Sequence, residues 1–191
     1  GGQSAGEQHD FLLRIRKETE RIHRVLRDLL DFARAASRRD DQPGAIAEAI
    51  SDAVALVRPQ GSFRDVALSV DAEPDLPPVM LGNEHLVQVL LNLLLNAADA
   101  SGPRGKVTLR ANRNGSSIRV LVEDDGPGID PAIRERLFEP FVTTKEVGKG
   151  TGLGLAVCRG LVESAHGTIQ LDESHQPGAR FVVDLPIVPV P

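Results

Sequence analysis

Two glycine-rich segments about 25 residues apart constrain this chain more than any other feature. The first covers residues 124–129 (DDGPGI) and the second residues 148–155 (GKGTGLGL), with FEPF at 138–141 between them and NLLLNA at 92–97 upstream. One glycine segment alone marks an ordinary turn. The four elements in this order can supply a carboxylate for a base, a carboxamide for a metal ion and backbone amides for phosphates. The sequence therefore predicts a nucleotide-binding site.

The composition is that of a globular protein. Of the 191 residues, 41% are hydrophobic and 26% are charged, which is typical of one domain with an accessory element rather than of a disordered chain. A net charge of −5 disfavours a nucleic-acid partner, because phosphate backbones attract clustered Lys and Arg. No run reaches the roughly 18 apolar residues of a membrane helix, and no secretory signal opens the chain. We expect a cytoplasmic location.

Cysteine and histidine usage offers no metal or thiol chemistry. Cys158 is the only cysteine, which excludes an intrachain disulfide and favours a reducing compartment. It stands in an apolar helical run with no histidine beside it, so we expect a buried, inert thiol. Five histidines without ligand spacing give no pattern for a zinc site.

Residues 9–37 have the pattern of a long amphipathic helix. Apolar residues recur every seven positions from Ile15 to Ala36, and their neighbours widen the stripe to the width of a helix bundle. A helix of this length spans roughly 40 Å and cannot bury the stripe against itself. We expect it to pair with a helix of another chain or with one outside this sequence. A polar linker follows at 37–44.

The rest of the chain mixes helices and strands. Helices are predicted over 45–57, 83–100 with Asn83 as its N-cap, 131–137 and 151–165. Strands are predicted over 66–70, 106–112, 117–123, 168–171 and 180–185. The central pair forms a hairpin with Asn114 and Gly115 in its turn, since both positions of such a turn favour positive φ. The predicted fold is an α/β two-layer sandwich, with helices on one face of a mixed, largely antiparallel sheet.

The predicted helix at 83–100 carries three polar side chains on one face. Asn92, Asn96 and Asp99 follow at spacings of four and three, opposite an apolar face. They could be buried polar groups that satisfy neighbouring backbone. Alternatively, a carboxamide oxygen, especially that of Asn96, could ligate Mg²⁺, which prefers oxygen ligands and often binds few protein groups besides the nucleotide.

Asp124 ends a strand and enters the first glycine segment. Its carboxylate could accept a hydrogen bond from the exocyclic amine of adenine, with Gly126 and Gly128 letting the base approach the backbone. An ordinary strand-ending turn is the alternative, because Asp-Gly and Pro-Gly are common turn pairs.

The second glycine segment leads into a helix. Its backbone amides and the helix start favour phosphates, and Lys145 and Lys149 add positive charge. It lacks the ending of a Walker A loop and does not follow a strand, so neither a P-loop nor a dinucleotide fold is supported. The loop between Phe141 and Gly150 has the pattern of a lid, with Phe138 and Phe141 packing as its anchor.

Together these elements resemble the sensor histidine kinases of two-component signalling. Their catalytic domain has the Bergerat-type fold of the ATPase group that includes gyrase, the heat-shock-ninety chaperones and MutL. Residues 92–96 are similar to the N box, 124–128 to the first glycine box, 138–145 to the F box and 150–154 to the second glycine box. The likeness covers residues 45–187, and residues 96–100 are similar to the nitrogen-regulation subgroup. Other members have a lysine or histidine where Asp99 stands.

The resemblance implies ATP or ADP and Mg²⁺ as cofactors and a role for each matching residue. Asn96 would bind Mg²⁺, Asn92 and Lys145 would act on the phosphates as catalytic residues, and Asp124 would bind adenine. The implied nucleotide-binding residues are Asn92, Asn96, Asp99, Asp124, Gly126, Gly128, Ile129, Phe138, Phe141, Thr144, Lys145, Gly148, Lys149, Gly150, Thr151, Gly152, Leu153 and Gly154.

The chain departs from the family in one respect. Residues 1–40 resemble the second helix of the dimerisation hairpin, but the phosphoacceptor histidine belongs to the first helix, and no matching motif occurs here. His9 and His23 have the wrong neighbours, so we expect solvated helix residues there. The resemblance implies γ-phosphoryl transfer to a histidine absent from this chain, relay to a response regulator and homodimerisation, in the cytoplasm or in the cytoplasmic part of a membrane-bound sensor. This chain alone would bind nucleotide without phosphorylating itself.

Two other functions stay open at this point. One is a nucleotide-responsive interaction module, in which ATP sets the lid and the long helix docks a partner without phosphotransfer. The other is a related serine kinase or ATPase.

Overall fold

The computed structural model describes residues 42–145 and 150–189, together with positions 10–13, 15, 16, 18, 19, 22, 26 and 30. The positions described between 10 and 30 are helical, as expected for that segment. Their large apolar side chains are all exposed, and those of Phe11, Ile22 and Leu30 are more than half exposed. Some predicted features lie outside the described residues. They are the rest of this helix, His9, His23, most of the linker, Gly148 and Lys149.

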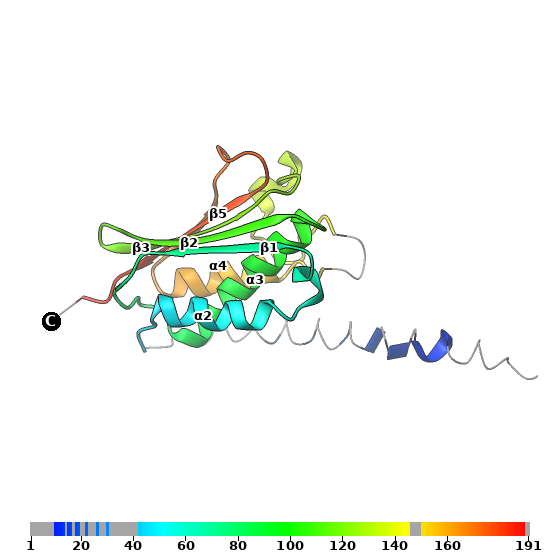
Figure 1. Cartoon of the computed structure of the whole chain (residues 1–191), viewed down its shortest axis with the longest axis horizontal. Helices are drawn as coiled ribbons and strands as arrows, with labels where there is room; N and C mark the ends of the chain where they lie inside the picture. Colours follow the sequence, from blue (N-terminus) through cyan, green and yellow to red (C-terminus); the bar gives the residue numbers. More distant parts are fainter. Residues whose placement is uncertain are drawn as a thin grey trace, which may run out of the picture.

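The body of the protein is a five-stranded sheet with helices on one face (Figure 1). The strand order is β1-β2-β3-β5-β4, with β1 parallel to β2 and every other pair antiparallel. The strands are β1 (Ala67–Ala72), β2 (Lys106–Asn114), β3 (Ser117–Asp124), β4 (Thr168–Leu171) and β5 (Arg180–Pro186). This confirms the predicted mixed, largely antiparallel sandwich.

Within residues 42–145 and 150–189, three α-helices and two short 3₁₀ turns complete the fold. They are α2 (Ile46–Val57), η1 (Gly61–Phe63), α3 (Asn83–Ser101), η2 (Pro131–Arg136) and α4 (Gly154–Ser164). Parallel strands need a crossover connection, and α3 provides it between β1 and β2. The connection therefore holds α3 against the sheet, and α2 and α4 lie on the same side (Figure 1).

Alternation along the strands sorts side chains between the two faces of the sheet. The inward positions of β2 and β3 are apolar and buried, for example Leu109 and Val120. The outward positions carry paired charges: Arg119 donates to both oxygens of Asp184 at 2.9 and 2.8 Å, and Glu123 accepts from Arg180 at 2.6 Å. One face therefore packs on the helices while the other carries an ionic network.

Three local predictions were wrong in detail. Asn83 is the first residue of α3, after an N-cap at Gly82; its Oδ1 accepts instead from the backbone N–H of Ala45, the residue that precedes α2. Only Gly115 has positive φ in the hairpin turn, because β2 continues through Asn114, which pairs with Ser117. Helix α4 begins at Gly154 rather than at 151, since the glycines before it adopt an irregular path.

Cys158 is fully buried on α4, as predicted, and burial raises the pKa of its thiol to about 12. Its Sγ faces the carbonyl oxygen of Val89 on α3 at 3.8 Å. Because the thiolate is the reactive form, we expect a colorimetric disulfide reagent at pH 8 to leave the native thiol unmodified and to titrate it fully in denaturant. Rapid modification of the native protein would contradict this burial.

Candidate functional site

Helix α3 presents Asn92, Asn96 and Asp99 away from the core, while its opposite face, from Leu86 to Ala98, supplies buried residues. Asn92 donates through Nδ2 to the carbonyl oxygen of Gly154 at 3.3 Å. That bond joins α3 to the first residue of α4, so the start of α4 lies beside the asparagine face. The predicted separation of polar and apolar faces is confirmed.

Asp124 is the most buried charged residue in the described part of the chain, with an exposed fraction of 6%. Its Oδ1 accepts from the backbone N–H groups of Gly126 at 2.9 Å and Ala179 at 3.2 Å. Within the described residues, Oδ2 accepts no hydrogen bond. The two backbone donors thus fix the carboxylate and leave one acceptor oxygen for an external N–H group, such as a purine amine.

Burial raises the pKa of Asp124, an effect that the hydrogen bonds from Gly126 and Ala179 only partly oppose. Protonation would replace the acceptor by an O–H donor. We therefore expect adenosine affinity to fall as pH decreases, beginning at a pH above the ordinary aspartate pKa of about 3.9. Adenosine is the suitable probe because it carries no titrating phosphate. An affinity that stays constant down to pH 4 in fluorescence competition would contradict the role of Asp124.

The loop between Phe141 and Gly150 has a first flank at residues 141–145 and a second flank at residues 150–152. These two flanks are held together. The backbone N–H of Phe141 donates to the carbonyl oxygen of Gly152 at 2.9 Å, and Gly152 has a φ of +69°. A Cβ at Gly152 would lie 2.6 Å from the carbonyl carbon of Phe141. Only glycine fits this close approach in this conformation without strain.

Lys145, on the first flank, reaches the polar face of α3. Its ammonium lies 3.1 Å from Oδ1 of Asn96 and 2.6 Å from Oδ2 of Asp99. The positively charged ammonium of Lys145 therefore contacts the carboxamide oxygen that was predicted to bind a metal ion. An amide and a carboxylate oxygen converging on one cation match the ligands that Mg²⁺ prefers. These residues fit a nucleotide-bound Mg²⁺.

Comparison with known proteins identifies the family. The profile described as "Histidine kinase-, DNA gyrase B-, and HSP90-like ATPase" matches residues 82–189. The matched range contains Asp124, the polar face of α3 and both flanks of the loop. The chain belongs to this ATPase family.

Individual proteins that are similar to this chain are sensor histidine kinases. The sensor histidine kinase ZraS of Escherichia coli O157:H7 is 35% identical over 184 residues, which is 96% of this chain and 40% of ZraS. The structure of full-length ShkA in complex with AMPPNP has a TM-score of 0.79 and 26% identity, and it covers 100% of this chain and 41% of ShkA. The mycobacterial sensor histidine kinase MprB has a TM-score of 0.66 and 29% identity over 78% of this chain and 99% of that chain. The chain spans about two fifths of the length of ZraS.

The F box of this ATPase domain differs from the prediction. Phe138 is partly buried and packs edge-on against Phe181 of β5, with ring centroids 6.3 Å apart. Phe141 is 67% exposed with a φ of +67°, so the two phenylalanines do not form a joint anchor. Thr144 is also exposed, whereas Leu153 of the second glycine box is buried.

Two glycines beside Asp124, Gly126 of the first glycine box and Gly178 before β5, have a packing reason that the sequence did not reveal. A Cβ at Gly126 would lie 2.7 Å from the carbonyl oxygen of Ala100, at the end of α3. A Cβ at Gly178 would overlap the carbonyl oxygen of Asp124. Protein backbone therefore fills the space that a side chain would need at Gly126 and at Gly178, while the role of Gly126 and Gly128 in letting a base approach stays a prediction.

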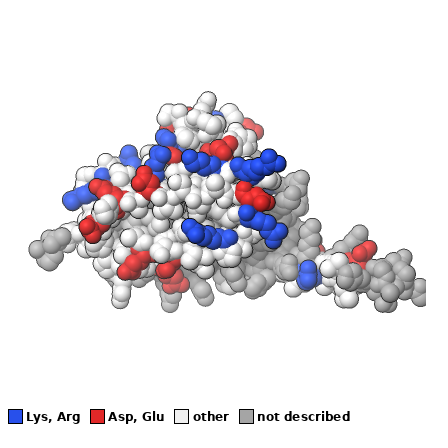
Figure 2. Space-filling view, in the orientation of Figure 1, with Lys and Arg blue, Asp and Glu red and all other residues white. Residues whose placement is uncertain are grey.

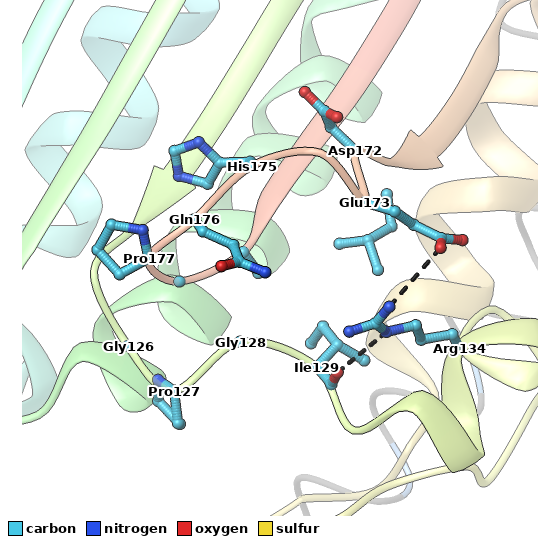
Figure 3. Close-up of a pocket in the computed structure, with 13 residues that line it drawn as sticks. Gly126, Pro127, Gly128, Ile129, Arg134, Asp172, Glu173, His175, Gln176 and Pro177 are labelled. Atoms are coloured by element: carbon cyan, nitrogen blue, oxygen red, sulfur yellow. Dashed lines mark hydrogen bonds and ion pairs between the residues drawn. The ribbon is translucent and has the colours of Figure 1, made fainter.

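A cavity of about 410 Å³ lies between residues 126–129 and the loop that joins β4 to β5 (Figure 3). Arg134 bridges its two sides, because it donates to the carbonyl oxygen of Ile129 at 3.1 Å and pairs with Glu173 at 3.6 Å. Of the predicted nucleotide-binding residues, the cavity is lined only by Gly126, Gly128 and Ile129. It adjoins the Asp124 site without including the α3 face.

Sequence reasoning missed Ala179, whose backbone N–H orients the Asp124 carboxylate. A backbone donor leaves no mark in the sequence, although the Pro177-Gly178 turn before β5 was a usable signal.

Acidic and basic side chains are interspersed over the face shown in Figure 2, with no continuous basic area there. In the described part of the chain, no helix is both long and apolar enough to cross a membrane.

Proposed function

We propose that this chain is the ATP-binding catalytic region of a sensor histidine kinase, formed by residues 45–187 and preceded by part of a dimerisation helix at 1–40. The observation that carries the proposal is the arrangement of two groups at one edge of the fold. Asp124 offers one free carboxylate oxygen, and Lys145, Asn96 and Asp99 form a charged cluster where the loop flanks meet α3. The first group suits adenine and the second suits phosphates with their metal ion.

Each group has a defined task in this proposal. Oδ2 of Asp124 accepts from the adenine amine, while its Oδ1 stays on two backbone donors. Oδ1 of Asn96 ligates Mg²⁺, and Asn92 holds the start of α4 in place. A bound Mg²⁺ would neutralise charge on the phosphate oxygens. Lys145 and the amides of residues 150–154 supply the remaining positive potential.

The reaction would transfer the γ-phosphoryl group of ATP to a histidine imidazole outside this chain. A nitrogen of the imidazole attacks the γ-phosphorus, the bond to the β–γ bridging oxygen breaks, and ADP leaves. Catalysis then depends on positioning and on charge stabilisation. ATP use of this kind suits a cytoplasmic location.

The partners follow from this reaction. An aspartate of a response regulator receiver domain would accept the phosphoryl group from the histidine. The exposed apolar side chains described between Phe11 and Leu30 support pairing of this helix within a homodimer. The complex of ShkA with AMPPNP supports binding of an adenine nucleotide to the same fold.

A mixing experiment tests the proposal. The chain is incubated with γ-labelled ATP, Mg²⁺ and a separate polypeptide carrying the first dimerisation helix of the parent protein. We expect acid-labile label on that polypeptide and none on the chain incubated alone. Nucleotide binding without transfer would favour the interaction module, and release of free phosphate would favour an ATPase. Label on His9 or His23 of the isolated chain would contradict the proposed division of roles.

A further inference from the structure

Asn96 and Asp99 hold one ammonium between them. Nζ of Lys145 is 3.1 Å from Oδ1 of Asn96 and 2.6 Å from Oδ2 of Asp99, although Lys145 is 49 and 46 positions away along the chain. The spacing of three residues places the two oxygens on the same face of α3. The Lys145 and Asp99 side chains are 32% and 43% exposed, so a cation can enter from solvent.

The ammonium position is set by the packing of the loop flank. The backbone N–H of Lys145 donates to Oγ1 of Thr143 at 3.1 Å. A Cβ at Gly150 would lie 3.1 Å from Cδ of Lys145, so the lysine stem passes directly over the second flank. The second end of the loop therefore lies against the stem of the lysine that contacts α3.

We propose that Lys145 and the nucleotide-bound divalent cation compete for one site made by Oδ1 of Asn96 and Oδ2 of Asp99. Asp99 is then a second protein ligand of the cation, in addition to Asn96. This inference rests on the proposed function. It extends that function by naming the two ligand oxygens and the ammonium group that occupies their site before the metal ion binds.

Charge and geometry support one shared site. Oδ1 of Asn96 and Oδ2 of Asp99 both contact the Lys145 nitrogen, at 3.1 and 2.6 Å, so the two oxygens converge on one position. Amide and carboxylate oxygens are suitable ligands for a hard cation. Two cations cannot occupy that position because they repel each other. When the metal ion enters, the lysine leaves, and its flexible stem lets the ammonium move to the phosphates. The exchange couples metal binding to movement of the first loop flank.

The test titrates Mg²⁺ into the chain with a fluorescent ATP analogue and compares the wild type with Asp99→Asn. We expect the variant to need roughly tenfold more Mg²⁺ for half of the Mg²⁺-dependent gain in ATP affinity, because a charged ligand is lost. Without Mg²⁺ its ATP affinity rises severalfold, because Lys145 is released toward the phosphates. Lys145→Met should change both quantities in the opposite direction. This variant needs less Mg²⁺ for the half-maximal gain, and its ATP affinity without Mg²⁺ falls.

Two controls separate this inference from the proposed function. Asp52→Asn makes the same charge change on the exposed face of α2 and leaves both quantities unchanged. Adenosine, which carries no phosphate, binds the wild type and all three variants equally. If adenosine binds but Asp99→Asn does not raise the Mg²⁺ requirement, Asp99 is only a counter-ion of Lys145 and the shared site is refuted. If adenosine does not bind the wild type, the proposed function fails as well.

Discussion

Asp124→Asn is expected to lower ATP affinity by on the order of 100-fold or more without loss of folded stability. The asparagine Oδ1 can still accept from Gly126 and Ala179, which directs its Nδ2 donor at the adenine amine in place of an acceptor. A lost charge-assisted hydrogen bond together with an unpaired buried donor corresponds to roughly 3 kcal/mol. Fluorescence titration with an ATP analogue measures the affinity, and thermal unfolding measures the stability.

The stability of this variant follows from the pKa of Asp124. Burial raises the pKa of this carboxyl in the folded state above its value in the unfolded chain. The free energy of unfolding therefore falls as pH rises from the unfolded-state pKa to the folded-state pKa, and it stays lower at higher pH because the buried carboxylate is then ionised. Asparagine removes the buried charge, so the unliganded variant should unfold at the same temperature as the wild type or higher at pH 7. Asp124→Ala instead leaves the N–H groups of Gly126 and Ala179 without their acceptor, at a cost of about 1–3 kcal/mol each.

Inosine gives the matching specificity control. Its O6 is an acceptor where adenosine has an amine donor, so wild-type Asp124 should reject it and the Asp124→Asn variant should prefer it over adenosine. Equal loss of both nucleosides together with a lower unfolding temperature would mean that the substitution damaged the fold and that Asp124 does not select the base.

Asn96→Ala is expected to reduce phosphoryl transfer to the separate helix polypeptide by roughly 10²- to 10³-fold, the usual effect of removing one electrostatic stabiliser of a transition state. Asn96 offers the only carboxamide oxygen that contacts the Lys145 ammonium in the described part of the chain. Adenosine affinity should not change, because Asp124 is untouched. Initial rates of acid-labile labelling at saturating ATP provide the measurement.

The control for this substitution is Asn112→Ala, an exposed asparagine on β2 whose Nδ2 donates only to the neighbouring carbonyl of Arg113. It should transfer phosphoryl groups at the wild-type rate. A transfer rate for Asn96→Ala within threefold of the wild type would refute the metal-binding role of Asn96.

Long, strongly patterned elements could be predicted from the sequence. The apolar face of α3 and the alternation in β2 and β3 follow from burial on one side, so all three elements were placed within about two residues. The errors fall where local signals compete with tertiary contacts. Asn83 has the chemistry of an N-cap but bonds Ala45, 38 positions away, and the glycines before α4 delay the start of that helix.

The candidate site was predicted as residue types but not as contacts. The asparagines, Asp124 and the glycines were identifiable because their chemistry is rare in such an arrangement. The pairing of Lys145 with Asn96 and Asp99 depends on how the first loop flank packs on α3, which no local pattern encodes. The exposure of Phe141 was missed for the same reason, since an aromatic residue is ordinarily expected to pack. The likeness of residues 96–100 to the nitrogen-regulation subgroup stays a prediction.

A crystal structure of the chain with Mg²⁺ and a non-hydrolysable ATP analogue tests the central claim most directly. We predict the adenine amine within hydrogen-bond distance of Oδ2 of Asp124, with the metal ion on Oδ1 of Asn96 and the Lys145 ammonium displaced from that oxygen. A purine bound instead in the cavity between residues 126–129 and the β4–β5 loop, with Lys145 still on Asn96, would contradict the account.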